Sequence, residues 1–244
     1  MTYCVGLKLN KGLVFMSDTR TNSGIDNIST FRKMHTWSRE GDRVITLLNA
    51  GNLATTQLVI SLLDDRAKAP NDRSPSIFEA QSMFQVAQLV GETLREVIET
   101  ASPKGELADS NFKATLILGG QISTGRPSLF LIYPEGNFIE ASIDTPFFQS
   151  GETKYGRPIL IRAYEPDMSF EEAVKLLLVS FDSTIKANLS VGLPLDLEIY
   201  RADTLTTSEH RRFQSDDPYY QIISNGWGEA LREALKSLPD YSFK

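Results

Sequence analysis

Side chains that could serve as a catalytic base are scarce in this chain. It contains two histidines, His35 and His210. His35 has no acidic neighbour in the sequence and His210 lies in a polar tail, so we interpret both as surface residues. A phosphate-binding glycine loop, a G-x-S-x-G elbow and an H-E-x-x-H pair are all absent from the sequence. Triad, phosphate-transfer and zinc-peptidase chemistry therefore lack their usual motifs.

A hydroxyl can also be activated by a free α-amine, when the nucleophile is the first residue of the mature chain. Thr2 directly follows Met1, and a small second residue permits removal of the initiator methionine. No long propeptide precedes Thr2, so we expect its exposure to depend on methionine aminopeptidase and not on autolysis. If Met1 stays attached, the nitrogen of Thr2 is an amide and cannot act as a base.

The segments around Thr2 are predicted to be strands. Residues 2–9 alternate, with Tyr3, Val5, Leu7 and Leu9 on one side, and residues 10–12 (NKG) form a turn. Residues 13–16 and 44–48 are nearly all apolar, which is typical of strands covered on both faces. Thr2 therefore begins the first strand of a hairpin.

Two helices are expected to follow. The first covers residues 53–66, with a stripe of Leu58, Val59, Leu62 and Leu63. The second is predicted to begin at Ser76, because Glu79 three residues later completes a capping box. Its apolar stripe consists of Ile77, Met83, Val86, Val90, Leu94 and Val97.

The second half of the chain mixes strands and helices. Strands are predicted at residues 115–118, 129–133 and 138–142, with a turn at 134–137. A third helix opens with the capping box of Ser169 and Glu172, residues 195–200 form an alternating strand, and residues 227–238 form an amphipathic helix. Strands linked by hairpins, with helices in separate blocks, indicate antiparallel sheets with helical layers outside and not a parallel doubly wound sheet.

Composition limits the function classes. The formal net charge is −6 and the isoelectric point is about 5.1, which argues against a nucleic acid as partner. The single cysteine, Cys4, excludes an internal disulfide and a cysteine metal cluster, as expected in a reducing cytoplasm. No apolar run reaches the roughly 18 residues of a membrane span, and the first 15 residues lack a secretory signal core. No cofactor is expected.

The spacing of the polar residues resembles that of a proteasome β-type subunit. The resemblance rests on Thr2, residues 17–24 (SDTRTNSG), Lys33, and residues 49–51 (NAG) before a helix. The closer similarity, through MTYCVGLKL, SDTRTNSGIDNISTFRKM and QSGETKYG, is to the bacterial proteasome-related Anbu family. It implies one α+β domain over residues 1–244, folded as the four-layer αββα sandwich of N-terminal nucleophile hydrolases.

The resemblance also implies the catalytic roles. Thr2 would supply the nucleophilic Oγ, and its α-amine would take the proton directly or through a water. Lys33 would be a buried ammonium beside Thr2 that favours the alkoxide and lowers the pKa of the amine. Asp18 would pair with Lys33, because a buried lysine without a partner tends to become neutral.

Further roles follow from the same resemblance. Ser150 would hydrogen-bond the terminal amine, the N–H of Gly51 would stabilise the oxyanion, and Asn22 and Gly51 would bind the substrate main chain. Related subunits carry an aspartate shortly before a Ser-Gly-Gly; here residues 187–192 read ANLSVG, so only Ser190 matches. Asn49, in the segment expected to form the floor of the specificity pocket, is polar.

Each of these residues also has a structural interpretation without a catalytic role. Residues 18–20 could form a capped turn with an ion pair, Lys33 could be solvated, and Ser150 with Gly151 is an ordinary turn dipeptide. Thr2, Asp18, Lys33 and Ser150 together, at the spacing of the family, favour the catalytic interpretation.

Three functions remain in competition at this point. The leading hypothesis is a threonine-type peptidase acting on peptides or unfolded proteins; the others are an amidohydrolase for a small amide and a non-catalytic assembly subunit. Fold alone does not separate them. We also expect a homo-oligomeric ring or helix, because many aromatic residues could serve at interfaces. These are Phe78, Phe84, Phe147, Phe148, Phe213, Tyr219, Tyr220 and Trp227. The sequence identifies no unfoldase partner.

Overall fold

Two antiparallel sheets face each other in the computed structural model, which describes residues 2–22, 28–69, 75–101, 112–206 and 209–243. In spatial order, the first sheet contains β10 (Phe147–Gly151), β1 (Tyr3–Leu9), β2 (Gly12–Asp18), β11 (Leu195–Arg201) and β12 (Glu209–Phe213). The second contains β5 (Met34–Arg39), β6 (Arg43–Gly51), β7 (Ala114–Ile122), β8 (Ser128–Ile132) and β9 (Phe138–Glu140). A short ladder joins β3 (Arg20–Asn22) to β4 (Ile28–Thr30).

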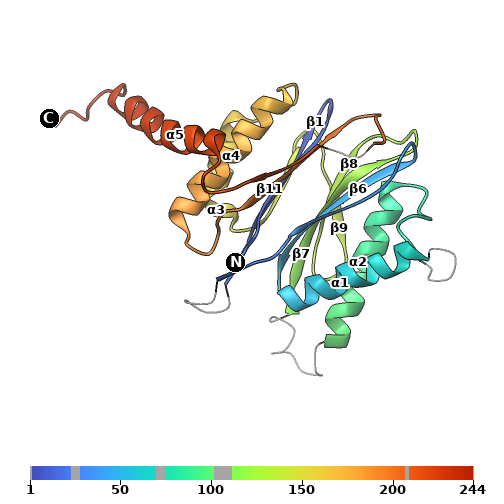
Figure 1. Cartoon of the computed structure of the whole chain (residues 1–244). Helices are drawn as coiled ribbons and strands as arrows, with labels where there is room; N and C mark the ends of the chain where they lie inside the picture. Colours follow the sequence, from blue (N-terminus) through green and yellow to red (C-terminus); the bar gives the residue numbers. More distant parts are fainter. Residues whose placement is uncertain (1, 23–27, 70–74, 102–111, 207–208, 244) are drawn as a thin grey trace.

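Helices cover the outer face of each sheet (Figure 1). The second sheet is covered by α1 (Leu53–Lys68) and α2 (Met83–Ala101), and the first by α3 (Thr153–Ala163) and α4 (Phe170–Ala187). The last helix, α5 (Pro218–Lys236), packs on α4 and extends away from the body. The predicted α+β sandwich of four layers, αββα, is confirmed.

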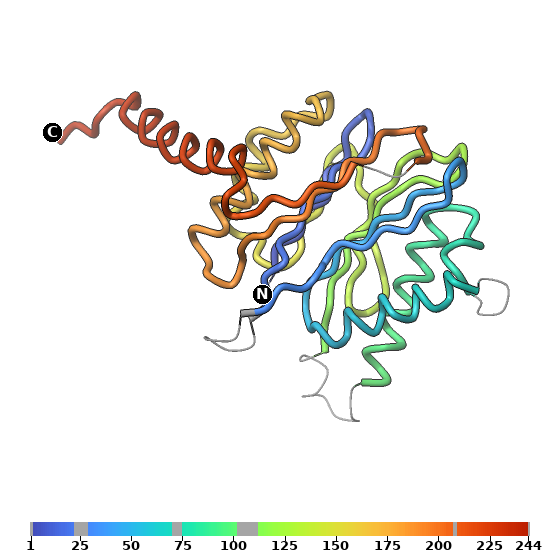
Figure 2. Tube along the Cα trace, in the orientation of Figure 1, coloured from blue at the N-terminus to red at the C-terminus, as the bar shows by residue number. Residues whose placement is uncertain are grey.

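Burial explains why the strands pair as they do. Along β1, Tyr3, Val5 and Leu7 face the helices α3 and α4, whereas Cys4 faces the second sheet. The first hairpin is confirmed, but its turn is shorter than predicted, because Gly12 already belongs to β2 and stands opposite Leu9. Figure 2 shows that the β1–β2 hairpin lies beside β11, far away in the sequence, and β2 pairs with β11 along its whole length. The ends of β1 and β2 that carry Thr2 and Asp18 thus lie together.

The long second helix starts later than predicted, at Met83 and not at Ser76. The reason is Arg43, whose guanidinium donates to the carbonyl oxygens of Ile77 at 2.8 Å and Ala80 at 2.9 Å. Those carbonyls are engaged by a side chain, and the segment forms turns in which the Ser76 hydroxyl caps only Phe78. The stripe from Met83 to Val97 is buried as predicted.

The buried face of α1 was also misassigned in part. Leu58 is 45% exposed, and Ile60 is buried in its place. Thr55 and Thr56 belong to the buried face because their hydroxyls donate to the carbonyl oxygens of Phe112 and Leu53, both at 3.0 Å. The buried face of α1 is therefore displaced from the stripe that the apolar residues alone predict.

Several elements give no clear sequence signal. The strand β12 has only Phe213 buried, and β5, β10 and α3 were not predicted. The helix α5 begins nine residues before the predicted start, at Pro218, after Asp217 caps its first turn. The capping box of Ser169 and Glu172 on α4 is confirmed.

Most of the aromatic residues assigned to interfaces pack within the chain itself. Phe213 is 1% exposed, Phe148 and Tyr220 are 4% exposed, and all three join the cores. Phe84 remains 58% exposed. Among the described residues, no helix combines the length and apolar character needed to cross a membrane.

Two helical glycines differ in how closely the neighbouring layer packs against them. A Cβ at Gly91 in α2 would lie 2.2 Å from the carbonyl oxygen of Gly136, in the β8–β9 turn, whereas one at Gly226 in α5 would meet nothing within 4 Å. We expect Gly91→Ala to lower the free energy of unfolding by about 1–3 kcal/mol, and Gly226→Ala to raise it by up to about 1 kcal/mol. Urea unfolding measures both. Equal effects of the two variants would contradict this packing.

Candidate active site

A buried ion pair joins Asp18 and Lys33. The Lys33 Nζ lies 2.7 Å from Asp18 Oδ1, and the two side chains are 4% and 0% exposed. Asp18 is the last residue of β2, and Lys33 precedes β5 of the opposite sheet. The pair thus links the two sheets at the end of the sandwich that carries Thr2.

Each member of the pair has further hydrogen bonds. Asp18 Oδ1 accepts the N–H of Tyr3 at 3.0 Å and Oδ2 accepts that of Gly192 at 3.4 Å. The ammonium of Lys33 also donates to the carbonyl oxygen of Arg20 at 2.6 Å. Burial raises the pKa of the Asp18 carboxyl, and the ammonium and both amides oppose this rise. The carboxylate is thus held by donors from three segments.

Thr2 lies at the start of β1 and is 8% exposed. Its carbonyl oxygen accepts the N–H of Glu152 at 2.7 Å. Gly151, the residue before Glu152, adopts φ +86°. A Cβ at this position would lie 1.8 Å from the carbonyl oxygen of Thr2, so the position requires glycine. Ser150, in the preceding position of β10, is buried and stands opposite Cys4 in the register.

The loop after α4 closes another side of the site. The Oδ1 atom of Asn188 accepts hydrogen bonds from the N–H of Ser190, at 3.0 Å, and from its hydroxyl. Arg20 donates to the carbonyl oxygen of Leu189 at 3.0 Å. Asn188 thus supplies a neutral acceptor to Ser190, where an aspartate was expected. This role of Asn188 was not predicted from the sequence, because related subunits carry a carboxylate there.

Each of the two proposed substrate-binding residues is the last residue of a strand. Gly51 is the exposed last residue of β6, with φ +125°, and a Cβ there would lie 2.5 Å from the carbonyl oxygen of Lys113. Asn22 ends β3 and pairs through its backbone with Ile28. The side chain of Asn22, Met1 and residues 23–27 lie outside the described part of the chain.

A hollow of about 390 Å³ adjoins this end of the sandwich. Asn49 lines it, and its N–H donates to the carbonyl oxygen of Lys33 at 2.9 Å. His35, half-buried in the wall, was taken for a surface residue; burial lowers the pKa of its imidazole, which favours the neutral form. The other lining residues are Phe31, Arg32, Leu53, Thr56, Gln57, Ile60 and Ser61.

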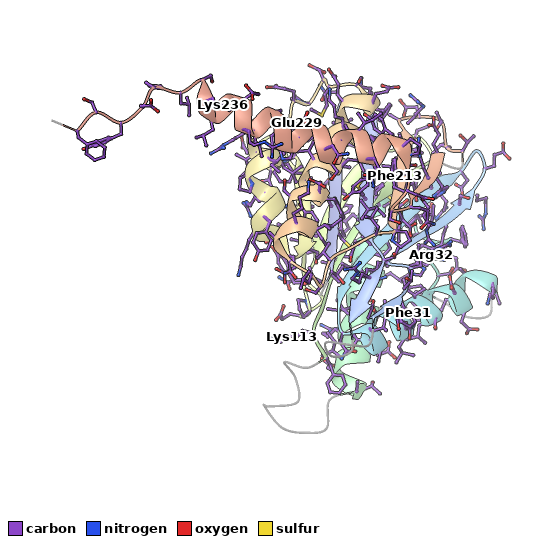
Figure 3. The ribbon with its side chains drawn as sticks, turned by 60° about the vertical axis from the view of Figure 1, so that its left-hand side comes forward. Phe31, Arg32, Lys113, Phe213, Glu229 and Lys236 are labelled. Atoms are coloured by element: carbon purple, nitrogen blue, oxygen red, sulfur yellow. The ribbon has the colours of Figure 1, made fainter. Side chains whose placement is uncertain are left out.

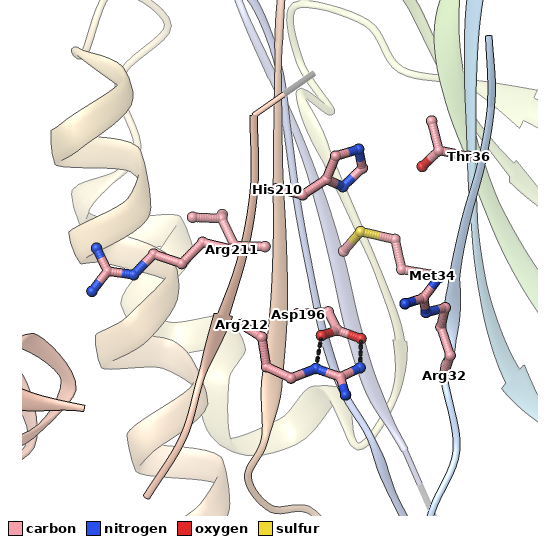
Figure 4. Close-up of a pocket in the computed structure, with 8 residues that line it drawn as sticks. Arg32, Met34, Thr36, Asp196, His210, Arg211 and Arg212 are labelled. Atoms are coloured by element: carbon pink, nitrogen blue, oxygen red, sulfur yellow. Dashed lines mark hydrogen bonds and ion pairs between the residues drawn. The ribbon is translucent and has the colours of Figure 1, made fainter. Parts of the chain in front are cut away.

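Arg32 also borders a second hollow, of about 340 Å³, between the edge strands β5 and β12 (Figure 4). In it Arg212 donates to both carboxylate oxygens of Asp196, at 2.6 and 2.8 Å. The buried carboxylate of Glu198 accepts the hydroxyl of Thr46 at 2.6 Å and so crosses between the sheets. His210, 46% exposed, lies 3.5 Å from Glu198 and has no link to Thr2 in the described structure.

The sequence matches a known protein family over most of its length. The family model for the proteasome subunit matches residues 2–198. A proteasome subunit beta of Haloquadratum walsbyi is 25% identical over 214 residues, covering 87% of this chain and 79% of that protein.

Solved structures are more similar. Anbu (ancestral beta-subunit) from Yersinia bercovieri is 46% identical with a TM-score of 0.92, and the match covers 99% of each chain. The helical assembly of the Anbu complex from Pseudomonas aeruginosa is 46% identical with a TM-score of 0.91, covering 98% of each. The fold is that of the N-terminal nucleophile hydrolases. The chain belongs to the proteasome subunit family, among the Anbu proteins.

Among the described residues, no three or more His, Cys, Asp or Glu side chains are grouped so that they could hold a metal ion. The polar groups that converge on Asp18 are instead amides and one ammonium. This set suits charge stabilisation by fixed N–H donors.

The ion pair has a measurable consequence for stability. We expect Asp18→Asn to lower the free energy of unfolding by about 3 kcal/mol, because it leaves a buried ammonium without its counter-ion. Adding Lys33→Met should recover part of that loss. The matched control is Asp196→Asn, whose arginine partner is 38% exposed, with an expected loss below about 1 kcal/mol. Equal losses for Asp18→Asn and Asp196→Asn in urea unfolding would refute the buried pair.

Proposed function

We propose that this chain is a threonine-type peptidase that uses Thr2 as its nucleophile once Met1 has been removed. The observation that carries the proposal is the position of Thr2 directly before Tyr3, whose N–H is bound to the carboxylate that holds Lys33. A terminal threonine beside a buried ammonium matches the requirement of nucleophilic catalysis by a hydroxyl with a nearby base.

The proposed reaction has two stages. The Thr2 hydroxyl attacks the peptide carbonyl, and its proton passes to the α-amine, directly or through a water. The C–N bond then breaks, the leaving amine takes that proton, and an ester on Thr2 Oγ remains. Water then attacks the ester carbonyl and gives its proton to the α-amine of Thr2. The bond between that carbon and Thr2 Oγ breaks, the proton returns to Oγ, and the carboxylic acid product is released. The Lys33 ammonium favours the alkoxide and lowers the pKa of the amine.

The remaining residues bind and support. In this proposal the N–H of Gly51 stabilises the oxyanion, and the main chains of Asn22 and Gly51 hold the substrate as an added strand. Ser150 hydrogen-bonds the terminal amine, and Ser190 with Asn188 supports the loop beside Asp18. The hollow at Asn49 would receive the substrate side chain.

Replacing the nucleophile tests the peptidase proposal. Thr2→Ala should abolish hydrolysis of a fluorogenic peptide library, because no hydroxyl remains to form the ester, while Thr2→Ser should keep part of it. Circular dichroism should show an unchanged fold, since a terminal hydroxyl contributes little to the core. Undiminished hydrolysis by the alanine variant would exclude Thr2. Hydrolysis of small amides but of no peptide would favour the amidohydrolase, and no turnover in the Met1-free protein would favour an assembly subunit.

We also propose that the chain, as one domain over residues 1–244, assembles with itself in the cytoplasm. A relative from Pseudomonas aeruginosa was solved as a helical assembly, which supports the proposal by similarity. The outer part of α5 exposes Leu231 and Leu235, 50% and 72%, on a helix that projects from the body (Figure 3). Exposed apolar side chains in such a row are typical of protein interfaces.

The assembly proposal predicts a mass well above that of one chain. Light scattering at micromolar concentration should give several times 27.2 kDa. Leu231→Ser with Leu235→Ser should lower that mass, whereas Ile143→Ser, at a 98% exposed site on a loop, should leave it unchanged. A monodisperse monomer of the unaltered protein at these concentrations would reject self-assembly.

A further inference from the structure

The side chain of Tyr3 reaches from the first strand into the helical layer. Its ring is fully buried and lies 4.4 Å, centroid to centroid, from that of Phe181 in α4. Its hydroxyl is 2.8 Å from Ser180 Oγ and accepts a hydrogen bond from Gln149 Nε2 at 2.5 Å. One phenol thus binds both α4 and β10.

The surroundings are shaped to this hydroxyl. A Cβ at Gly156 of α3 would lie 2.2 Å both from the Tyr3 hydroxyl and from Ser180 Oγ, so only glycine leaves room for the contact. Burial raises the pKa of Tyr3 to about 12, so the phenol stays protonated and can donate at neutral pH. The contact is therefore a fixed one between neutral groups.

An N-terminal nucleophile has a particular mechanical difficulty. Once Met1 is removed, Thr2 is attached to the chain only through Tyr3, and chain ends are poorly ordered unless they are tied down. The described contacts that tie down this end include the strand pairing of Tyr3 with Gly151, the Thr2 carbonyl with Glu152, the Tyr3 amide with Asp18, and the Tyr3 phenol. Three of these four belong to Tyr3.

We infer that Tyr3 is a positioning residue for the nucleophile, with Ser180 and Gln149 as its anchors. The inference rests on the proposed function of Thr2 and goes beyond it, since it assigns the placement of the hydroxyl to a phenol that touches neither substrate nor the reacting atoms. A displacement of about 1 Å at a reacting group can cost about a hundredfold in rate.

The test compares buried tyrosines that differ in location. Tyr3→Phe removes the hydroxyl and keeps the ring, and Ser180→Ala removes its partner. The matched control is Tyr200→Phe in β11, because Tyr200 is 1% exposed and donates to Gln121 at 2.7 Å. Tyr200 stands opposite Leu13, at the far end of β2 from Asp18. Each Met1-free variant is treated with a peptide epoxyketone, and the inactivation constant kinact and the binding constant KI are measured separately.

We expect Tyr3→Phe to lower kinact at least about tenfold with KI within about twofold of the unaltered protein. Ser180→Ala should act in the same direction, and the double variant should lose little more than Tyr3→Phe alone. Tyr200→Phe should keep kinact even if it lowers the melting temperature. A kinact within about twofold for Tyr3→Phe, or an equal loss for Tyr200→Phe, would overturn the assignment.

Crystal structures of the same variants give a second readout that needs no activity. Thr2 should be displaced or poorly ordered in Tyr3→Phe and Ser180→Ala, and fixed in Tyr200→Phe. Failure of the unaltered, Met1-free protein to react would refute the proposed function, and the position of Thr2 in these crystals would then decide the positioning role alone. An unmoved Thr2 in both Tyr3→Phe and Ser180→Ala would refute the positioning role of Tyr3.

Discussion

The ion pair between Asp18 and Lys33 is the interaction on which the rest of the site depends. Two charges removed from water are tolerated only when both remain and their other hydrogen-bonding positions are filled. Here the filling groups are the amides of Tyr3 and Gly192 and the carbonyl of Arg20. The requirement to satisfy the pair therefore brings the first strand, the β3 segment and the loop after α4 to one place.

The sandwich supplies the frame for that convergence. Its three apolar cores, two beneath the helices and one between the sheets, fix strands whose ends carry Thr2, Asp18 and Gly51. In the core between the sheets, the buried carboxylate of Glu198 is paired with the hydroxyl of Thr46. The proposed catalytic residues at strand ends thus sit on a rigid scaffold.

The sequence predicted the layers because alternation and capping are local signals, as at β1 and at Ser169. It did not predict the late start of α2, which depends on Arg43 far away in the chain, nor the buried threonines of α1. The site residues could be named only by resemblance, since the contact of Asp18 with Lys33 spans two sheets. The acceptor role of Asn188 is visible only in the structure, because a neutral amide in place of a carboxylate is not recognisable in the sequence as the partner of Ser190.

In the proposed mechanism, Thr2 carries a free α-amine beside this ion pair. The most direct test is the mass of the N-terminal peptide after the purified protein reacts with a peptide epoxyketone, with fragmentation to locate the adduct. We expect a peptide that begins at Thr2 and carries the electrophile bonded to both its hydroxyl and its amine. Retention of Met1 in every molecule, or an adduct on another residue with Thr2 unmodified, would contradict it.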